Sequence, residues 1–527
     1  MEQGMTTSIV VSRATCKTDS RCLRAFSLPV FSRRGVADLT RHLCSHAVMH
    51  TCFPLALAPA FLLALLVVAA PLVGCSHQDR MKPIINFYEM GDYAAASKEI
   101  VPLLKDRRDS EKDRTIYELE AGAIYAASGE LALSIQSFGH ADERMWKYLD
   151  EEPEVRISEQ AAAILTNQTV VTYRGRAHDR IMCTTYQALN QLAEGNLESA
   201  GVSLRRAYEW QRDAVENNAK EIEALEAKSK AASEEKSYDA QAALDDEGVK
   251  TGLESEYGPI REMKGYAEFA IPYSTYLQAL QHQLTGRADA LAQATVEFRR
   301  VAGMLSETDR IYAEADAQLA EAAATGAPIP PMVYVFFETG MAPWLKEFRL
   351  DIPLFMRQVP YVGAAFPVLK FNEGAVTGFT VRAGTQSYAS SLLTDMDRVI
   401  ADDFNRRLPA IITLTIVSSA TKAIATYFAQ QAAYQQNPNA AIFVAIAAAA
   451  YQIGTNSADL RTWLTLPKQV LYARFPAPNE GTIEIDLGDG QKIGPLAVES
   501  KGATIVHLRL PKAGVQTAVR SMRIPLE

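Results

Sequence analysis

The sequence predicts a mostly α-helical protein, with a helical N-terminal domain over residues 84–320 and an α+β C-terminal domain over residues 328–527. In the first part, small and apolar residues recur at helical spacing after turn glycines. After Pro328-Ile329-Pro330-Pro331, which is typical of a stiff linker, short runs of β-branched and aromatic residues begin. A chain of 527 residues is long enough for two or three domains.

The chain begins with a segment that we expect to be removed. An apolar run from Phe53 to Val73 contains three prolines and ends at Gly74-Cys75, which is typical of a bacterial lipobox rather than a permanent membrane span. We expect residues 1–74 to be a mis-assigned extension plus a lipoprotein signal peptide, with the true start near Val36 or Met49. Cys75 would then be the acylated N-terminus, and residues 75–83 a tether. A bitopic anchor is the alternative.

Charge and cysteine content agree with an envelope location. The chain has a net charge of −9, and removal of residues 1–74, with seven basic and three acidic residues, makes it −13. Such acidity argues against nucleic acid or anionic lipid as the main partner. Of six cysteines, the mature chain would keep only Cys75 and Cys183. We expect Cys183 to be a buried apolar residue, and no intramolecular disulfide.

The helical domain shows a repeated pattern that resembles the second helix of a tetratricopeptide repeat. After a turn glycine, small or apolar residues follow at positions that share one helix face, which lets a partner helix approach closely. The expected first helices are 84–90, 116–128 and 181–194, and a weaker copy is expected after Gly286, with residues 269–284 as its first helix. Uneven spacing makes this a degenerate array at best, and a generic helical bundle is the alternative. The repeat-packing residues are Gly91, Ala96, Gly129, Phe138, Ala141, Gly195, Ala200, Leu204 and Ala207.

Residues 211–257 form a charged helical insertion with few large apolar side chains. We expect an extended, solvated helix that frays around residues 229–247, with a partner-docking arm as the alternative. Gly258-Pro259 should end any helix.

In the C-terminal domain we expect strands over 333–382, helices over 388–455 and strands over 469–524. Pro409 should break or kink the first helix. Two alanine-rich stretches, 411–433 and 440–453, suggest a buried helical hairpin, with an element lying on the membrane as the alternative. Gly488-Asp489-Gly490 is suited to a hairpin turn between strands.

Three segments, Val335–Pro343, Val359–Gly363 and Ala458–Gln469, resemble a family of uncharacterised bacterial lipoproteins. These combine tetratricopeptide-like helices with an α+β C-terminal half. They are often encoded beside a lipoprotein activator of peptidoglycan-synthesising penicillin-binding proteins. The resemblance therefore implies an envelope role, with such an activator as one partner, and supplies no reaction or catalytic residue.

The residues themselves show no catalytic constellation. None of the histidines at 77, 140, 178, 282 and 507 stands in a zinc-binding pair, and no nucleophile elbow or phosphate loop is present, so we expect no metal, no cofactor and no enzyme activity. Arg461 and Trp463 are candidate partner-binding anchors. In the alternative, Asp459 pairs with Arg461 and Trp463 fills the core.

The first functional hypothesis is a periplasmic scaffold, anchored by lipid in the outer membrane because Ser76 rather than Asp follows the cysteine. It would bind a protein partner through its helical repeats. The alternatives are an envelope enzyme acting on glycan or peptide, and a structural subunit of an outer-membrane assembly. A polar pocket with paired carboxylates would favour the enzyme, and an exposed apolar groove would favour the scaffold.

Overall fold

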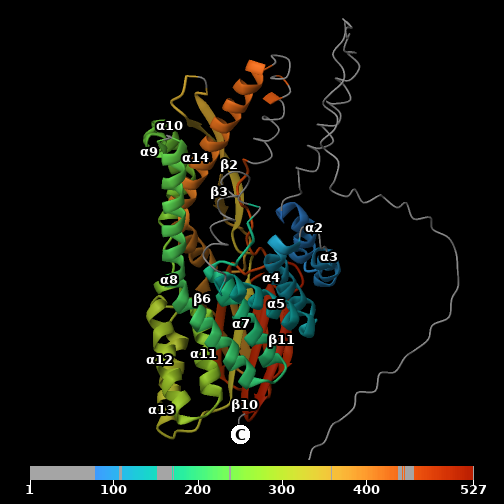
Figure 1. Ribbon diagram of the computed structural model, residues 1–527. Coiled ribbons are helices and arrows are strands. Elements are labelled where there is room, and N and C mark those ends of the chain that lie inside the picture. The colour runs from blue at the N-terminus through green and yellow to red at the C-terminus, as the bar shows by residue number, and fades with distance from the viewer. Residues whose placement is uncertain are drawn as a thin grey trace, which may run out of the picture. The chain divides into compact units, whose positions relative to one another are not determined.

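The computed structural model describes residues 77–525, except 106–109, 151–168, 170, 237–238, 358, 437–441, 443 and 446–455. Cys75, the signal segment and most of the second alanine-rich stretch therefore lie outside the described residues. Within them, a helical N-terminal half is followed by a half that contains sheets and one long helix, which confirms the expected order of a helical and an α+β part (Figure 1).

The helical half is built from consecutive helices that contact each other in pairs, α2 with α3, α4 with α5, α7 with α8, and α11 with both α8 and α12. The helices are α2 (His77–Glu89), α3 (Tyr93–Lys105), α4 (Ser110–Ser128), α5 (Leu131–Asp150), α7 (Ala177–Ala193), α8 (Leu197–Lys236), α11 (Pro272–Leu284), α12 (Ala288–Met304) and α13 (Ile311–Ala324).

Glycines with positive φ end the first helix of each pair. Gly91, Gly129 and Gly195 have φ of 74°, 83° and 78°, a conformation that costs side-chain-bearing residues energy. Each donates its N–H to a carbonyl three residues back, and the next residue donates to a carbonyl five residues back, as in the Schellman motif. Gly286 has φ of 68° and makes the first of these bonds. The glycines therefore reverse the chain between paired helices.

The residues expected to pack the paired helices lie inside. Ala96, Phe138, Ala141, Ala200, Leu204 and Ala207 are at most 1% exposed. Helices α4 and α5 approach each other closely, since a Cβ added to Gly122 would lie 2.5 Å from the Phe138 ring.

The tether expected over residues 75–83 is wrong from His77 onward, because α2 begins there. His77, Met81, Ile84 and Tyr88 share one buried face, so apolar burial stabilises the helix from its first turn. The Gln78 amide also donates to the carbonyls of Leu345, at 2.6 Å, and Leu460, at 3.2 Å. The chain is thus docked on the C-terminal half by Gln78, three residues after Cys75.

A five-stranded sheet forms the centre of the C-terminal half. Its strand order is β11-β10-β1-β7-β6, with β1 parallel to β10 and the other pairs antiparallel. One face contacts the helices, and the other packs on a four-stranded sheet of order β5-β4-β8-β9. The strands are β1 (Met332–Thr339), β4 (Phe379–Ala383), β5 (Gln386–Ala389), β6 (Ser391–Asp395), β7 (Gln469–Pro476), β8 (Thr482–Leu487), β9 (Lys492–Ala497), β10 (Gly502–Leu510) and β11 (Ala518–Pro525).

The expectation of helix from residue 388 is wrong, because residues 388–389 end β5 and residues 391–395 form β6. Leu392 and Leu393 suit a helix face by spacing, but Leu392 pairs with Leu471 of β7 and Leu393 lies at the bulge that follows it in the strand. Helix α14 (Met396–Gln436) follows and passes through Pro409 without a break. Pro409 is exposed while Leu408 and Ala410 are buried, so packing on both sides outweighs the lost hydrogen bond.

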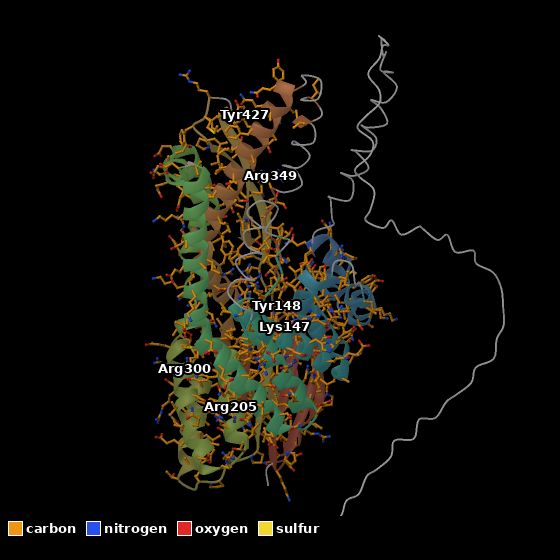
Figure 2. All side chains as sticks on the ribbon, viewed as in Figure 1. Lys147, Tyr148, Arg205, Arg300, Arg349 and Tyr427 are labelled. Carbon is orange, nitrogen blue, oxygen red and sulfur yellow. The ribbon has the colours of Figure 1, made fainter. Side chains whose placement is uncertain are left out.

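The charged insertion packs against other parts of the protein, whereas an extended, solvated helix was expected. Helices α8, α9 (Ala240–Asp245) and α10 (Glu247–Arg261) contact α14, and α10 also contacts the two-stranded sheet of β2 (Trp344–Pro353) and β3 (Tyr361–Lys370). Val249, Leu253, Tyr257 and Ile260 of α10 are buried. Gly258-Pro259 does not end the helix either, because it lies in the last turn of α10. Figure 2 shows side chains in the space between these helices and the two-stranded sheet, in the region where Arg349 and Tyr427 are labelled.

By length and composition, α14 is the described helix that is apolar enough to cross a membrane. Of its most apolar window, 72% is buried against other parts of the structure. Lys422 in this helix is buried, and burial lowers the pKa of its ammonium group to about 8.

Candidate functional site

The face of the five-stranded sheet that meets the helices carries four ionisable side chains near one end. Glu338 on β1 is paired in register with Arg509 on β10, and His507 on β10 is paired with Arg520 on β11. Because side chains alternate between the two faces of a strand, these residues share a face with buried Phe336 and Ile505. Apolar sheet surface therefore gives way to a polar patch.

Helices α4, α5 and α7 stand over this patch and line a half-open cavity of about 270 Å³ with it. This volume is close to the lower end of the range for ligand pockets, about 300–1,000 Å³. We call it the interface cavity, because it lies between the two halves of the chain. Its helical wall includes Ala126, Ala127, Leu131, Tyr186 and Asn190, and its other wall includes Glu338, Thr465, His507, Arg509, Arg520 and Ser521.

Glu338 and His507 form the acidic and imidazole part of the lining. Glu338 is 1% exposed, its Oε1 lies 2.9 Å from Nε2 of His507, and its Oε2 accepts a hydrogen bond from the Tyr186 hydroxyl at 2.9 Å. Burial, the largest single effect, acts to raise the pKa of Glu338, but His507, Arg509 and Tyr186 together outweigh it and hold the pKa below its usual value. Burial and the nearby Glu338 charge raise the pKa of Tyr186, which keeps its hydroxyl protonated as a donor.

Arg509 is fully engaged by the protein. Its guanidinium donates to the carbonyls of Gly340, at 2.7 Å, and Thr465, at 3.1 Å, and to the hydroxyl of Tyr88 at 3.1 Å. These acceptors belong to both halves of the chain. Arg509 therefore joins the halves beside the cavity.

Arg520 is held differently. Its Nη1 donates to Oδ1 of Asn190 and its Nη2 to the carbonyl of Ala126, both at 2.9 Å, and the Asn190 amide in turn donates to Ser134 Oγ at 2.8 Å. Burial lowers the pKa of the Arg520 guanidinium below its usual value, although such a group stays charged at neutral pH. Across the described part of the chain, the structure shows no carboxylate in an ion pair with it.

The two candidate partner-binding anchors lie inside the protein. Arg461 is 5% exposed and forms ion pairs with Asp459 at 2.7 Å and Asp113 at 2.9 Å. Trp463 is fully buried, with its ring centroid 5.8 Å from those of Phe138 and Tyr186. In this fold neither side chain can contact a partner, so the expectation of interface anchors is corrected to the alternative of an ion pair and a core tryptophan.

Glu120 of α4 fastens the segment that carries Trp463. Its carboxylate accepts hydrogen bonds from the N–H groups of Leu464, at 2.6 Å, and Thr465, at 3.1 Å, and from the Thr465 hydroxyl at 2.7 Å. That hydroxyl accepts from the Trp463 indole at 2.8 Å. Burial raises the pKa of Glu120 to about 7.

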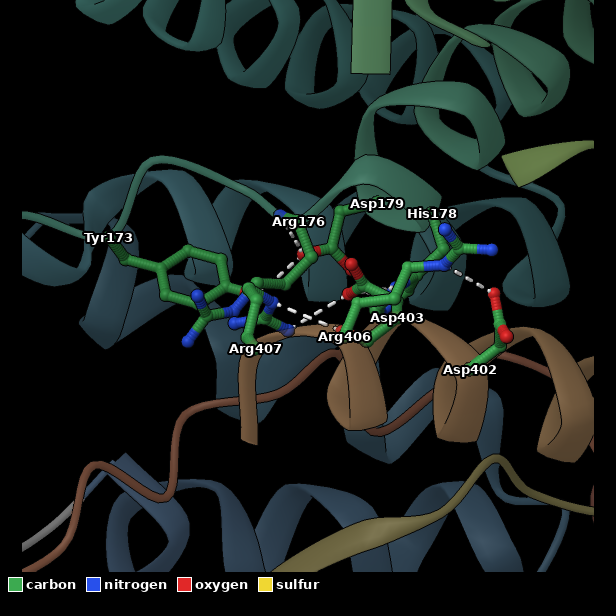
Figure 3. A network of polar contacts seen from close by, with 8 residues as sticks. All are labelled: Tyr173, Arg176, His178, Asp179, Asp402, Asp403, Arg406 and Arg407. Carbon is green, nitrogen blue, oxygen red and sulfur yellow. Dashed lines mark hydrogen bonds and ion pairs between the residues drawn. The ribbon is translucent and has the colours of Figure 1, made fainter. Parts of the chain in front are cut away.

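A second polar network joins α7 to α14 (Figure 3). Nδ1 of His178 lies 3.2 Å from Asp403, which also pairs with Arg407 at 2.9 Å. Burial, the largest single effect, acts to raise the pKa of Asp403, but Arg407, His178 and Arg176 together outweigh it and hold the pKa well below the usual value. The space beside His178 is only about 10 Å³, so this network connects two helices and leaves no room for a ligand.

Among the described residues, no three of the His, Cys, Asp and Glu side chains are arranged to hold a metal ion. Cys183 is buried, with its Sγ 3.4 Å from the carbonyl of Phe138, and burial raises the pKa of its thiol. No protein-family model, curated protein or solved structure matches this chain. The assignment of a function therefore depends on the geometry of the interface cavity.

The sequence interpretation missed Glu338, Arg509 and Arg520. The available signal was strand periodicity, since Val333 to Phe337 reads as a strand buried on both faces and Glu338 continues it. In a strand that is buried on both faces, a charged side chain lies away from solvent whichever face it is on. What the sequence could not show is that α4, α5 and α7 close over these charges.

Acid should destabilise the protein through His77. Burial, followed by the nearby Arg461 charge, lowers the pKa of His77 to about 3, from 6.5 in the unfolded chain. The unfolded state therefore binds the proton first, and stability that is present above pH 6.5 should be lost by about 1.4 kcal/mol per pH unit as pH falls toward 3. Glu120 has the opposite effect on stability. Because its pKa is raised on folding, its contribution to the free energy of unfolding increases as pH falls from 7 to 4.5.

The contribution of His77 is isolated by comparison with a His77→Phe variant. The free energy of unfolding of the wild type and of this variant is measured in denaturant from pH 7.5 to 4.5. As pH falls, the wild type should lose stability relative to the variant. A difference that stays constant across this range would show that His77 titrates normally.

Proposed function

We propose that this protein is a lipid-anchored binding protein of the cell envelope, which holds a ligand in the interface cavity and serves as a scaffold or adaptor. The observation that carries the proposal is the half-open cavity itself, which is lined on one side by three helices and at its sheet wall by Glu338, His507, Arg509 and Arg520. Ligand sites occur preferentially at such junctions between structural units. Both halves contribute side chains, so a bound ligand would link them.

The chemistry of the lining favours binding over catalysis. The donors of Arg509 are used on protein carbonyls and a tyrosine, and Glu338 is the one carboxylate among the lining residues. The carboxylate pair of a glycosidase is therefore not formed at this site. The observation that favours an envelope enzyme as the second candidate is the Glu338–His507 contact, because a carboxylate can orient an imidazole as a general base.

We further propose that the paired helices are a degenerate tetratricopeptide-like array. The glycine turns and the small buried residues between paired helices support this. Strands β6 and β11 contact α11, α4 and α7, so the protein's own sheet occupies the side of the array that these helices present to it. A protein partner would then bind to a surface of the array that the sheet does not cover. The lipoprotein resemblance suggests a peptidoglycan-synthase activator as that partner.

Acylation at Cys75 would place the fold directly against the membrane, and the lipobox suggests the outer membrane. Only Ser76 separates Cys75 from His77, which is buried, and consecutive Cα atoms are about 3.8 Å apart. The Cα atoms of Cys75 and His77 are therefore at most about 8 Å apart. The part of the molecule near Leu345 and Leu460 would face the lipid headgroups.

Labelled palmitate should enter the wild-type protein in its bacterial host, because the acyl chains would be attached at Cys75. Cys75→Ser should abolish both the label and the cleavage of the signal segment, whereas Cys183→Ser should retain both, since Cys183 is buried in the fold. Labelling of the Cys75→Ser variant would show that this cysteine is not the anchor.

The cavity is tested by filling it. Ala127 lines the interface cavity and is partly buried, so Ala127→Phe should place a ring in the space that a ligand needs. The matched control is Ala292→Phe, on the exposed face of α12. Full-length protein is purified from envelope, and small molecules released on unfolding are identified by mass spectrometry.

We expect a ligand from the wild type and from Ala292→Phe, and at least a tenfold lower yield, about 1.4 kcal/mol, from Ala127→Phe. The melting temperature of both variants is measured beside the yield. Equal ligand yield from all three proteins would contradict binding in the interface cavity.

A further inference from the structure

We infer that the protein contacts the membrane through a second surface, away from Cys75, which we call the docking tip. The docking tip consists of an exposed stripe at the end of α14 and of two aromatic side chains where the β2–β3 hairpin turns. Its residues are Ala425, Phe428, Ala429 and Ala432 on α14, with Phe355 and Tyr361 on the hairpin. The inference rests on the proposed acylation of Cys75, and it does not involve the interface cavity.

The end of α14 presents an uncharged face to solvent. The four residues of the stripe follow the i, i+3, i+4 and i+7 spacing of one helix face, and all four are exposed, Phe428 by 60%. None of the residues 423–435 is charged. Nearer its start the same helix carries the ion pair of Asp402 and Arg406, at 2.8 Å. Because the outward face of a surface helix is normally polar or charged, the stripe suits an apolar environment.

The turn of the hairpin presents aromatic rings in the same way. Phe355 is 65% exposed and Tyr361 is 63% exposed. Phe355 has φ of 55°, a left-handed conformation that costs energy for a residue with a Cβ atom. The backbone is thus strained at a position that exposes a phenyl ring, and such strain is typical of functional positions. Arg357 is the one charged residue in the loop 354–360.

The two parts of the docking tip lie at one end of the molecule. Figure 1 shows the β2–β3 hairpin and the last turns of α14 at this end, and Figure 2 labels Tyr427 there. They are separate projections, a helix end and a hairpin turn. A protein partner would need a matching shape to cover both, whereas a fluid lipid surface adapts to them.

The lipid anchor keeps a membrane within reach of the docking tip. Gln78, three residues after Cys75, donates its amide to the Leu345 carbonyl of β2 at 2.6 Å. Phe355 follows Leu345 by ten residues, so at about 3.3 Å per residue the two are at most about 33 Å apart. Tethering at this distance gives the lipid surface a high effective concentration at the docking tip. We therefore assign the phospholipid surface as its occupant.

The test measures the depth of a nitroxide spin label in a bilayer. Phe428→Cys is labelled in the mature acylated protein, which is placed in phosphatidylcholine nanodiscs with a single protein in each disc. Zwitterionic lipid is used because the contact is apolar. Cys183 is buried and Cys75 would be acylated, so the label reacts with the introduced cysteine. The matched control is Val296→Cys on α12, because Val296 is also 60% exposed.

We expect the label at position 428 to lie about 5–10 Å inside the headgroup boundary, the depth of elements that lie in the membrane interface. Its collisions with dissolved oxygen should exceed those with an aqueous nickel chelate, whereas the label at position 296 should stay in water. Ala425→Glu with Ala429→Glu should return the label at position 428 to water, because charged side chains enter a bilayer at high cost. Both alanines are exposed, and circular dichroism checks that the double variant folds.

Equal access of the nickel chelate to both labels would overturn the inference, as would a label at position 428 that stays in the bilayer when the two glutamates are present. Protection of that label in vesicles holding many copies, but not in discs holding a single protein, would also overturn it and would assign the surface to a second copy of the chain. Absence of palmitate from the wild type would remove the premise, and the inference with it. Acylated protein with an aqueous label at position 428 would remove the inference alone and leave the anchor and the interface cavity in place.

Discussion

Trp463→Ala should reduce the free energy of unfolding by about 3–5 kcal/mol, the cost of truncating a buried tryptophan. The indole is fully buried and packs between Phe138 of α5 and Tyr186 of α7, so its loss leaves a cavity between the two halves of the chain. The Thr465 hydroxyl also loses its indole donor. Equilibrium unfolding in denaturant, followed by circular dichroism, measures the change.

The control is Tyr434→Ala, because this aromatic side chain on α14 is 63% exposed. Its truncation should change the free energy of unfolding by less than about 0.5 kcal/mol. A loss below 1 kcal/mol for Trp463→Ala would mean that the ring is not in the core, and it would return this segment to the candidates for a partner-binding surface.

Arg461→Ala should be similarly destabilising, by about 3–5 kcal/mol, because it leaves two carboxylates without their cation. Although burial acts to raise the pKa of Asp459, Arg461 holds that pKa below its usual value, so the carboxylate is charged at neutral pH. Asp113, on the helical half, is the second partner at 2.9 Å. The same denaturant measurement applies.

Arg382→Ala is the matched control, because the Arg382–Glu484 pair is more than half exposed on both sides and such pairs contribute about 0–1 kcal/mol. Adding Asp459→Asn to Arg461→Ala should restore part of the lost stability, since the uncompensated charge is then removed. If Arg461→Ala costs no more than Arg382→Ala, Arg461 does not join the two halves.

Local patterns in the sequence were enough to predict the paired helices and most strands. Gly91, Gly129 and Gly195 mark helix ends because only a glycine takes positive φ without strain. Strand β8 lies within the region 469–524 where strands were expected, since alternation of apolar and polar side chains is a property of the strand itself.

Tertiary contacts decide the elements that the sequence did not predict. Leu392 and Leu393 follow helical spacing but lie in β6, where Leu392 pairs with β7, and Pro409 lies inside a helix because its neighbours are buried. Arg461 and Trp463 have the composition of interface anchors, and they do form an interface, between the two halves of this chain. The interface cavity combines residues from 88 to 521, a separation that no short motif can reveal.

Hydrogen exchange of the full-length protein, purified with its envelope ligand and compared with the same protein after unfolding and refolding without it, tests the central claim most directly. If the ligand lies in the interface cavity, exchange should slow together in residues 123–131, at the end of α7 and in β11, and α12 should be unaffected. Unchanged exchange in those three segments while the protein carries a ligand, or slowing confined to the outward faces of α8 and α12, would contradict binding between the helices and the sheet.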